Sequence, residues 1–479
     1  MKQTPLYKNK KFLLILIVLF GIILRLAFFT GMTISDPLAY SKAANDINIG
    51  KGIDPASTLT LSTRLGIVYA TAFSYRIFGI NDFSSVSFTL LTSIGSIILI
   101  YYFGKLLFDE NIGLTAAFLL SFFPLDVVYS TQLVSDIPSA FFMSLGVYVF
   151  LYSEIKNKTN YWSYLLSGLL IGIGYLIRES ALLIALFFVA YILYKRKLKF
   201  QYFMVPLGVL IVIMLEMLVF MNLTGDPFFR FTTSQDYLKE ASALHNYFGR
   251  LDFPIGLLHY PWMFLTNELL SAFYIFASFA ALYFLMQRKK KTYTLLLWLI
   301  PLLIYLSFGS GSLTKYVPFR AVDRYTMIFT IPAILLLALF LKTNKFIEKK
   351  KLMTFSIGIL MLSSIFAAYL HDNRNQLGRL RELSAEILAF QKPIYIDERS
   401  LLALNYISGF KNSADLRQYP DDMSKISDSY VIINAEMIRN LKEANPAIIL
   451  PKETEKIPSS WQLIKETGTK EKISIYEAR

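Results

Sequence analysis

The sequence has no cysteine, only three histidines and few charged residues for its length. Without cysteine there can be no disulfide, no thiolate metal site and no cysteine nucleophile. Charged residues make up 17% of the 479 positions, whereas 55% are hydrophobic, and the apolar residues come in long blocks. This combination excludes an ordinary soluble domain and is typical of an integral membrane protein.

The net charge of +14 does not indicate nucleic acid as a partner. The basic residues lie in short clusters between the apolar blocks, where membrane topology accounts for them better. A basic start followed by the apolar stretch 12–29 resembles a signal peptide, but the stretch is long and no small-residue cleavage site follows it. We expect this stretch to be retained as the first membrane span.

We predict an α-helical polytopic membrane protein, because a span needs about 20 apolar residues, or about 17 at the least. About eleven stretches meet this rule, near residues 12–30, 84–106, 112–131, 137–153, 161–177, 180–194, 203–221, 263–286, 293–309, 323–341 and 352–370. With a cytoplasmic N-terminus, every basic cluster falls on the cytoplasmic side, as the positive-inside rule requires. The predicted location is the cell (plasma) membrane.

The extracytoplasmic side then receives two long outer loops, 31–83 and 222–262. Within the first loop, residues 61–80 are apolar but contain Arg64 and Arg76, and two arginines would be costly in a lone span. We expect an amphipathic helix in the outer interface there, which also preserves the charge asymmetry of the loops.

The composition changes after residue 371, which predicts a transmembrane domain over 1–371 and a soluble extracytoplasmic domain over 372–479. In the second of these, short β-like runs alternate with helical pieces, so we expect a small α/β domain. The expected strands lie at 393–397, 430–434, 461–464 and 472–476, and the expected helices at 400–407 and 435–443. No glycine-rich phosphate loop or catalytic constellation occurs there, which favours an accessory lid or docking module.

Ionisable residues at the outer ends of the predicted spans are candidates for a functional site, because burying them is costly unless they are paired. Asp36 lies in the stretch that directly follows the first span, with Tyr40 one turn later. An acid at that place can meet both a lipid head group and a water-soluble partner. We expect an outward-facing polar cavity to gather these two residues with Asp126, Asp136, Arg178, Lys315, Arg320, Asp323, Arg324 and Tyr325.

Each candidate also has a purely structural interpretation. Asp36 precedes a proline and is a good helix start, and Asp136 could be no more than a helix cap. Arg178 could form a local ion pair with the glutamate that follows it, while Arg324 could reach lipid head groups. Lys51 could be an ordinary solvated lysine.

Several short motifs follow one another in a fixed order along the chain. They are Asp36, Tyr40, Ala43 and Ala44 in the first loop, Tyr69-Ala70 through Phe78-Gly79, Pro124 with Tyr129-Ser130, Ser135-Asp136-Ile137-Pro138, a glycine-rich stretch closing on Leu176-Ile177-Arg178, and Arg324-Tyr325 before Pro332. Over roughly residues 10–370 this order resembles the GT-C fold glycosyltransferases that depend on polyprenyl-phosphate sugars. That group holds the protein O-mannosyltransferases and the aminoarabinose transferase that modifies lipid A. Many of its members have a second acid directly after the loop aspartate, where this chain has Pro37.

The resemblance implies a glycosyltransferase that moves a sugar from a polyprenyl-phosphate donor to an extracytoplasmic acceptor. The acceptor would be a protein, a glycolipid or a cell-envelope glycan. Asp36 would be the general base of an inverting displacement. Arg178 and Arg324 would bind the donor phosphate, with Lys51 or Arg64 as further candidates.

Tyr40, Asp126, Asp136 and Tyr325 would line the cavity or contact the acceptor. No cofactor is required and no metal site is assigned, although Asp36 and Asp136 together could hold a divalent cation. Membrane lipids are the other expected partners.

Three other functions fit the same composition. One is a structural membrane protein that presents the C-terminal domain, although about eleven spans are far more than an anchor needs. A transporter or flippase of a lipid-linked or small anionic substrate is the main alternative, but transporters usually place charges near mid-membrane and often contain inverted repeats. A ligase or polymerase of lipid-linked glycans would need similar outward-facing arginines while using a pyrophosphate-linked donor.

Overall fold

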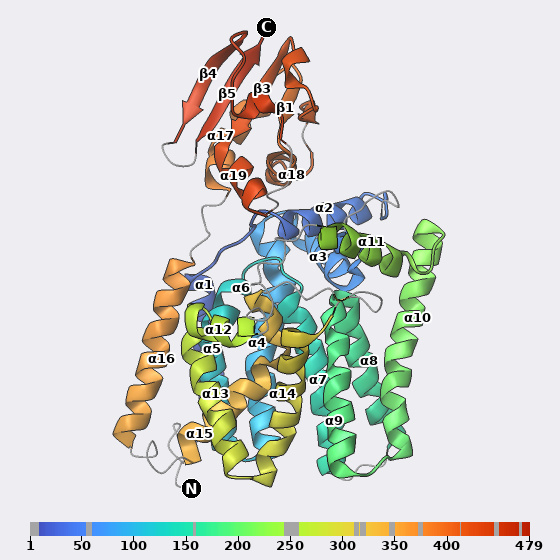
Figure 1. The fold of residues 1–479 in the computed structure, drawn as a ribbon, viewed down its shortest axis with the longest axis vertical. Coiled ribbons are helices and arrows are strands. Elements are labelled where there is room, and N and C mark those ends of the chain that lie inside the picture. Colours follow the sequence, from blue (N-terminus) through green and yellow to red (C-terminus); the bar gives the residue numbers. More distant parts are fainter. Residues whose placement is uncertain are drawn as a thin grey trace.

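The protein is a bundle of long helices with a small sheet domain stacked on one end (Figure 1). A computed structural model describes residues 9–53, 60–156, 160–243, 258–310, 316, 322–343, 350–371, 377–411, 413–444, 450–468 and 472–479. The outer ends of the bundle helices meet a layer of shorter helices, and the sheet domain rests on that layer (Figure 1).

Within the described residues, six helical segments are long and apolar enough to cross a membrane, which agrees with an integral membrane protein. They are Asp82–Leu107 (α4), Asp136–Ile155 (α7), Phe200–Thr224 (η4 and α10), Lys290–Phe308 (η6 and α14), Asp323–Thr343 (η7 and α15) and Met353–Leu370 (within α16). The other bundle helices are α1 (Lys10–Ala27), α5 (Glu110–Ser121), α8 (Tyr161–Ile177), α9 (Ala185–Lys195) and α13 (Ser271–Met286). The predicted total of about eleven spans stays a prediction.

Two of the predicted spans are not continuous helices. The stretch 112–131 ends its first helix at Ser121, and α6 (Pro124–Tyr129) starts anew, because Pro124 has no amide hydrogen to continue the ladder. The stretch 263–286 breaks between α12 (His259–Thr266) and α13, where the Asn267 side chain accepts a hydrogen bond from the Leu269 amide at 3.0 Å. Hydropathy averages over such breaks and cannot reveal them.

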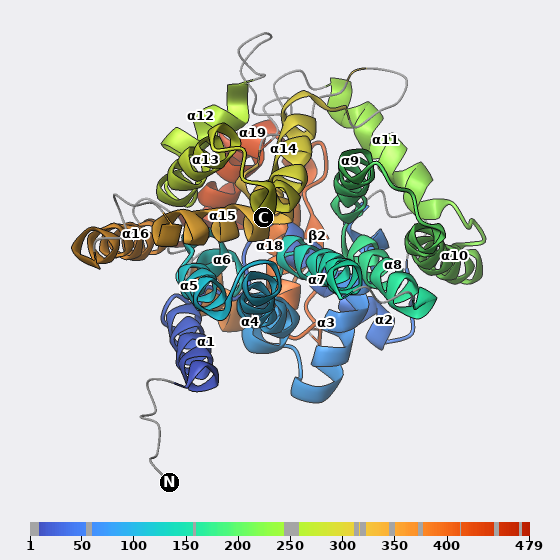
Figure 2. The same cartoon turned by 90° about the horizontal axis from the view of Figure 1, so that it is seen from below.

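Burial follows the position of each helix in the bundle. Nearly every residue of α15 is buried, whereas α10 and α16 lie at opposite edges of the bundle (Figure 2) and expose many leucine and phenylalanine side chains. An exposed apolar face on a helix of about 20 residues is what lipid contact requires.

The basic turns lie at the end of the bundle opposite the sheet domain. The turns after α9 and α13 contain residues 195–199 and 288–291, and both are at the lower end in Figure 1. This segregation fits the positive-inside rule. The assignment of that end to the cytoplasm stays a prediction.

A layer of short helices covers the other end. The helices α2 (Asp36–Asn48) and α11 (Phe229–Ala243) lie across the bundle rather than along it (Figure 1). Between α2 and the bundle lies α3 (Leu65–Phe78), which follows a 3₁₀ turn, η2 (Thr60–Thr63). With 14 residues, α3 is only about 21 Å long and too short to cross a bilayer. This length agrees with the interfacial helix expected over 61–80.

The C-terminal domain is a five-stranded mixed sheet with the strand order β2-β1-β3-β5-β4. Its strands are β1 (Ile394–Ile396), β2 (Leu416–Gln418), β3 (Ser429–Asn434), β4 (Trp461–Thr467) and β5 (Ile473–Ala478), and its helices are α17 (Gly378–Ile387), α18 (Glu398–Ile407) and α19 (Ala435–Ala444). β1 pairs in parallel with β2 and β3, and β5 pairs antiparallel with β3 and β4. The small α/β fold agrees with expectation, except that β2, a largely exposed three-residue edge strand, was not predicted.

The sheet domain packs onto the layer of short helices through a shared apolar core. One buried cluster contains Leu38 of α2 and Val68 of α3 together with Leu380 of α17 and Leu404 of α18. This core places the helix that begins at Asp36 directly beneath the C-terminal domain.

Candidate functional site

Asp36 is the first residue of α2 and lies beside three arginines. Its carboxylate Oδ2 is 3.7 Å from Nη2 of Arg324, and its side chain keeps 35% of its surface exposed. Burial by itself would raise the pKa of Asp36, but the charges of Arg324, Arg64 and Arg178 outweigh it and hold the pKa below its usual value. Asp36 is therefore ionised at neutral pH.

The residue before Asp36 has a strained backbone. Ser35 has a φ of 84°, which costs a non-glycine residue roughly 1–3 kcal/mol, and its hydroxyl lies 3.3 Å from Asp36 Oδ1. Pro37 then stands in the first turn of α2, where its missing amide hydrogen costs nothing. The expected helix start at Asp36 is thus present together with the arginine contacts.

Arg324 joins Asp36 to a second carboxylate. Its Nη1 lies 3.6 Å from Oδ2 of Asp136, the buried first residue of α7. Arg178, at the C-terminal end of α8, forms a tighter pair of 2.5 Å with the same Asp136 oxygen and lies 4.8 Å over the ring of Tyr325. Asp136 and Tyr325 therefore organise the two arginines, and four of the predicted residues meet Asp36 in one cluster.

Arg64 lies on the other side of this cluster, at the start of α3. Its Nη1 donates to the hydroxyl of Tyr40 at 2.5 Å, and that hydroxyl is 3.3 Å from Ser135 Oγ. Ser135 also accepts from Arg178 at 3.4 Å. Ser135 belongs to the motif Ser135-Asp136-Ile137-Pro138 but was not predicted as a site residue, and it links Arg64 to Arg178.

Glu179 does not pair with its neighbour Arg178, so the local ion pair considered from the sequence is not present. It lies 3.3 Å from Arg64 and 2.7 Å from Arg230 of α11. Burial would raise the pKa of Glu179, but these two arginines lower it well below its usual value. Arg230 also pairs with Glu216 of α10 at 2.5 Å. Glu216 is the only charged residue in the apolar stretch 203–221. This lone acid was the signal in the sequence that could have revealed its pair with Arg230.

The ring of Tyr129 packs against the guanidinium of Arg324. Arg324 lies 5.6 Å over the ring of Tyr129, and the tyrosine hydroxyl is 3.4 Å from Asp323. Because Tyr129 belongs to α6, the break after α5 brings an aromatic ring under the arginine that contacts Asp36. A continuous span over 112–131 would not produce this arrangement.

Two predicted residues lie away from the cluster. Asp126 is buried inside the bundle, where it pairs with Arg25 of α1 at 2.5 Å. Lys51 lies in the exposed turn after α2, and among the described residues no hydrogen bond or ion pair links its side chain to the cluster. Lys315 and Arg320 lie outside the described residues, and the expected cavity itself stays a prediction.

The guanidinium of Arg324 lies within 3.7 Å of both Asp36 and Asp136. A divalent cation held by the two aspartates, which would require Arg324 to turn aside, stays a prediction. In the described part of the chain, no group of three or more histidine, aspartate or glutamate side chains has a metal-binding arrangement.

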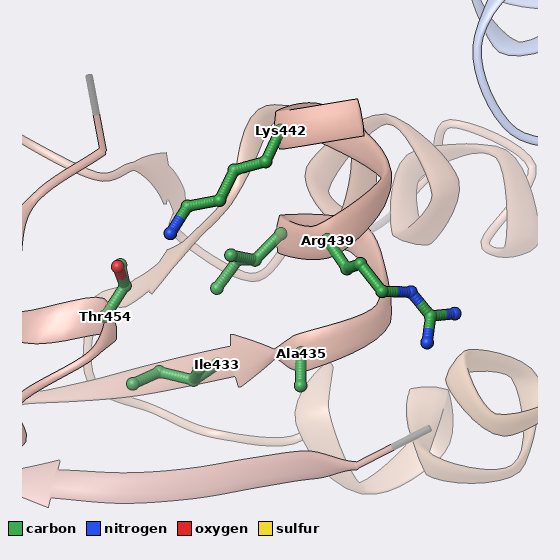
Figure 3. Close-up of a pocket in the computed structure, with 6 residues that line it drawn as sticks. Ile433, Ala435, Arg439, Lys442 and Thr454 are labelled. Atoms are coloured by element: carbon green, nitrogen blue, oxygen red, sulfur yellow. The ribbon is translucent and has the colours of Figure 1, made fainter. Parts of the chain in front are cut away.

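A pocket of about 420 Å³ lies in the C-terminal domain, between β3, α19 and Thr454. Two cations, Arg439 and Lys442, line it, but Figure 3 shows them extending in different directions from α19. Lys442 also pairs with Glu455. The two cations therefore do not converge on one anion, and the arginine cluster remains the candidate site.

Comparison with known proteins gives one sequence match and several structural ones. Residues 65–221 match the family model described as dolichyl-phosphate-mannose-protein mannosyltransferase. No curated protein has a sequence that matches this chain significantly.

Three of the similar solved structures extend over nearly all of this chain. ArnT from Cupriavidus metallidurans bound to undecaprenyl phosphate is 11% identical, with a TM-score of 0.53, and the match covers 96% of this chain and 97% of ArnT. The Archaeoglobus fulgidus oligosaccharyltransferase AglB with an inhibitory peptide and a dolichol-phosphate is 14% identical, with a TM-score of 0.56 and coverage of 99% and 75%. The Archaeoglobus fulgidus oligosaccharyltransferase in complex with Zn and sulfate is 16% identical, with a TM-score of 0.54 and coverage of 97% and 73%.

Identities this low establish the fold and not the activity. The family match and the structural matches together confirm the resemblance that the sequence motifs indicate. The chain therefore has the GT-C fold shared by ArnT and the archaeal oligosaccharyltransferase.

Proposed function

We propose that this protein is a membrane glycosyltransferase that moves a sugar from a polyprenyl-phosphate donor to an acceptor at the extracytoplasmic face of the cell membrane. The observation that carries the proposal is the position of ionised Asp36 beside Arg324 and Arg178 at one end of the helical bundle. The matched family model is described by its dolichyl-phosphate-mannose substrate, and the ArnT and AglB structures contain polyprenyl phosphates. These likenesses support the donor class.

Asp36 acts as the general base. The acceptor oxygen or nitrogen attacks the anomeric carbon, the bond from that carbon to the phosphate oxygen breaks, and its electron pair stays on the phosphate. The acceptor proton passes to the Asp36 carboxylate. A positioned base of this kind contributes about 10²–10⁴-fold to the rate. Direct displacement inverts the anomeric configuration.

Arg324 is the principal ligand of the departing phosphate, because its two carboxylate contacts are long. At 3.6 and 3.7 Å from Asp136 and Asp36 it can turn toward a phosphate without breaking a close hydrogen bond. Arg178 is held at 2.5 Å by Asp136 and supplies a fixed positive charge. Such preorganised cations stabilise the charge that develops on the leaving phosphate.

Arg64 and Tyr40 form the opposite wall, where Arg64 adds a third positive charge near Asp36. With three arginines supplying the electrostatic stabilisation, no step is assigned to a metal ion. In this proposal the N-terminus is cytoplasmic, and the C-terminal domain, residues 372–479, is extracytoplasmic. The acceptor is a protein, a glycolipid or a cell-envelope glycan.

The direct test is transfer by the purified protein in lipid nanodiscs. Labelled polyprenyl-phosphate sugars, beginning with the mannose donor, are incubated with an envelope extract, and the release of polyprenyl phosphate is measured. We expect release by the wild type and a loss of about 10²–10⁴-fold in Asp36→Asn, because the amide cannot accept the proton. Donor binding should be retained.

Asp46→Asn is the matched control. Asp46 lies on the same helix as Asp36, but it pairs with Lys42 across one helical turn, and among the described residues no ion pair joins it to Arg64, Arg178 or Arg324. Its turnover should stay within about twofold of the wild type. Turnover of Asp36→Asn near the wild-type level would remove Asp36 as the base. In sealed proteoliposomes, movement of intact donor across the bilayer without sugar release would favour the flippase alternative.

A further inference from the structure

Asp82, at the start of α4, connects the membrane domain to the C-terminal domain. Arg381 of α17 donates to both of its carboxylate oxygens, at 2.7 and 2.9 Å, and the hydroxyl of Tyr406 in α18 donates to Oδ1 at 2.8 Å. Two helices of the C-terminal domain thus hold one carboxylate of the bundle.

A chain of hydroxyl groups continues from this carboxylate to α2. Tyr406 is 3.1 Å from Ser85, Ser85 is 2.8 Å from Tyr75, and Tyr75 is 2.7 Å from Ser41. All four side chains are buried. The single hydroxyl hydrogen of Ser85 can go either to Tyr406 or to the backbone carbonyl of Asn81, which lies 2.7 Å away. In the assignment in which Ser85 donates to Tyr406, each hydroxyl donates toward Asp82, and the negative charge of Asp82 polarises the whole chain.

Ser41 lies on the helix that carries the reacting group. It follows Tyr40, whose hydroxyl bonds to Arg64, and stands little more than one turn after Asp36. Asp82 also meets the chain just before α2, since a Cβ at Gly31 would lie only 2.6 Å from its carboxylate. The carboxylate and the hydroxyl chain therefore hold both the approach to α2 and its middle.

We propose that the C-terminal domain is a positioning module that fixes α2, and with it Asp36, through Arg381, Tyr406, Asp82 and the hydroxyl chain to Ser41. The inference rests on the proposed function only for the reaction that Asp36 performs. It gives the C-terminal domain a role in catalysis without a catalytic residue of its own. A shift of about 1 Å in a reacting group can lower a rate substantially, so the fixed position of α2 has a measurable consequence.

The test compares Tyr406→Phe and Arg381→Gln with the wild type in nanodiscs. Tyr406→Phe keeps the ring in the shared core but removes the hydroxyl that joins Asp82 to Ser85. We expect kcat for transfer to fall about threefold to tenfold in each variant, with the donor KM unchanged, because the phosphate-binding arginines lie on other elements. Amide hydrogen exchange over residues 36–48 should become faster.

Tyr395→Phe is the matched control, because the Tyr395 hydroxyl bonds Arg417 within the same domain and removing it leaves the contact with Asp82 intact. It should change neither kcat nor the exchange of α2. Unchanged exchange over 36–48 in Tyr406→Phe would overturn the proposal whatever the activity, and faster exchange with unchanged kcat would overturn it as well. A wild type without any transfer would refute the proposed function, while the exchange measurement would still decide the coupling.

Discussion

Two arginine–aspartate pairs of this protein differ in almost every physical respect. Arg25 and Asp126 meet at 2.5 Å inside the bundle, with 0% and 5% of their side chains exposed. Arg324 and Asp36 meet at 3.7 Å at the end of the bundle, with 22% and 35% exposed. The first pair is sealed and close, whereas the second is open and loose.

The sealed pair is hydrogen-bonded to several other elements of the bundle. Arg25 donates to the carbonyl oxygen of Ser121, to Ser93 and to Asp126, and Ser93 donates to the same aspartate. The Ser121 carbonyl is available because α5 ends there and Pro124 follows. The pair therefore joins α1, α4, α5 and α6, and its groups are engaged in holding these helices together.

The open pair has the opposite property. Arg324 shares its charge between Asp36 and Asp136 at long distances, and neither contact is a close hydrogen bond. A charge held in this way can change partner at low cost when an anion arrives. We infer that the sealed pair stabilises the bundle and that the open pair performs the chemistry.

The largest expected effect is on stability, from Asp126→Ala. Removing one partner of a buried pair leaves Arg25 charged and uncompensated, so the free energy of unfolding should fall by about 3–5 kcal/mol. Chemical unfolding in detergent, followed by tryptophan fluorescence, measures the loss. Asp36→Ala, whose pair is partly exposed, should change the free energy of unfolding by less than about 1 kcal/mol.

The double variant Arg25→Leu/Asp126→Leu separates charge from packing. It removes both charges together, so it should be more stable than Asp126→Ala alone. Equal stability losses in Asp126→Ala and Asp36→Ala would abolish the distinction between a structural and a functional pair.

The next effect is on activity and its pH dependence, from Arg324→Gln. Loss of a cation that stabilises the leaving phosphate should lower kcat/KM by on the order of 10². Burial raises the pKa of Asp36, and among the charges that lower it Arg324 has the largest effect. Its removal should therefore raise the pKa of Asp36, so that the base becomes protonated at a higher pH.

The acidic limb of the pH profile of kcat/KM reports this change. In the wild type the lowered pKa of Asp36 keeps it ionised to a lower pH than an ordinary aspartate, and in Arg324→Gln the limb should move to higher pH. Arg417→Gln, which breaks an exposed pair with Asp415 in the C-terminal domain, is the control and should leave the limb in place. An acidic limb that does not move in Arg324→Gln would show that Asp36 is not the group that titrates.

Much of the fold could be predicted from the sequence because hydropathy and charge are properties of single stretches. The long apolar runs, the segregated basic clusters and the change in composition after residue 371 indicate the bundle and the sheet domain. The break after Thr266 leaves no signal in hydropathy. Pro124 signals a break or a kink after Ser121, but membrane helices also tolerate proline, so the sequence does not decide between the two. The strand β2 is as short as β1 but largely exposed, so it lacks the apolar residues that marked β1 in the sequence.

The site was predictable only in part, because a sequence shows which charges lie near a boundary but not which of them meet. Asp36, Asp136, Arg178 and Arg324 share one end of the bundle and come together. Asp126 stands at a similar depth by sequence, yet it pairs with Arg25, an arginine inside the first predicted span. The roles of these residues in transfer stay predictions for the experiments above.

The smallest expected effect comes from Lys51→Ala. Lys51 is exposed in the turn after α2, and solvated surface residues rarely change stability by more than about 0.5 kcal/mol. If Arg324 and Arg178 bind the donor phosphate, the donor KM and kcat of this variant should stay within about twofold of the wild type. Titration of the labelled donor at fixed acceptor concentration measures both. A donor KM raised tenfold or more would indicate that the phosphate binds near the C-terminal end of α2. It would weaken the assignment of Arg324 as the principal phosphate ligand.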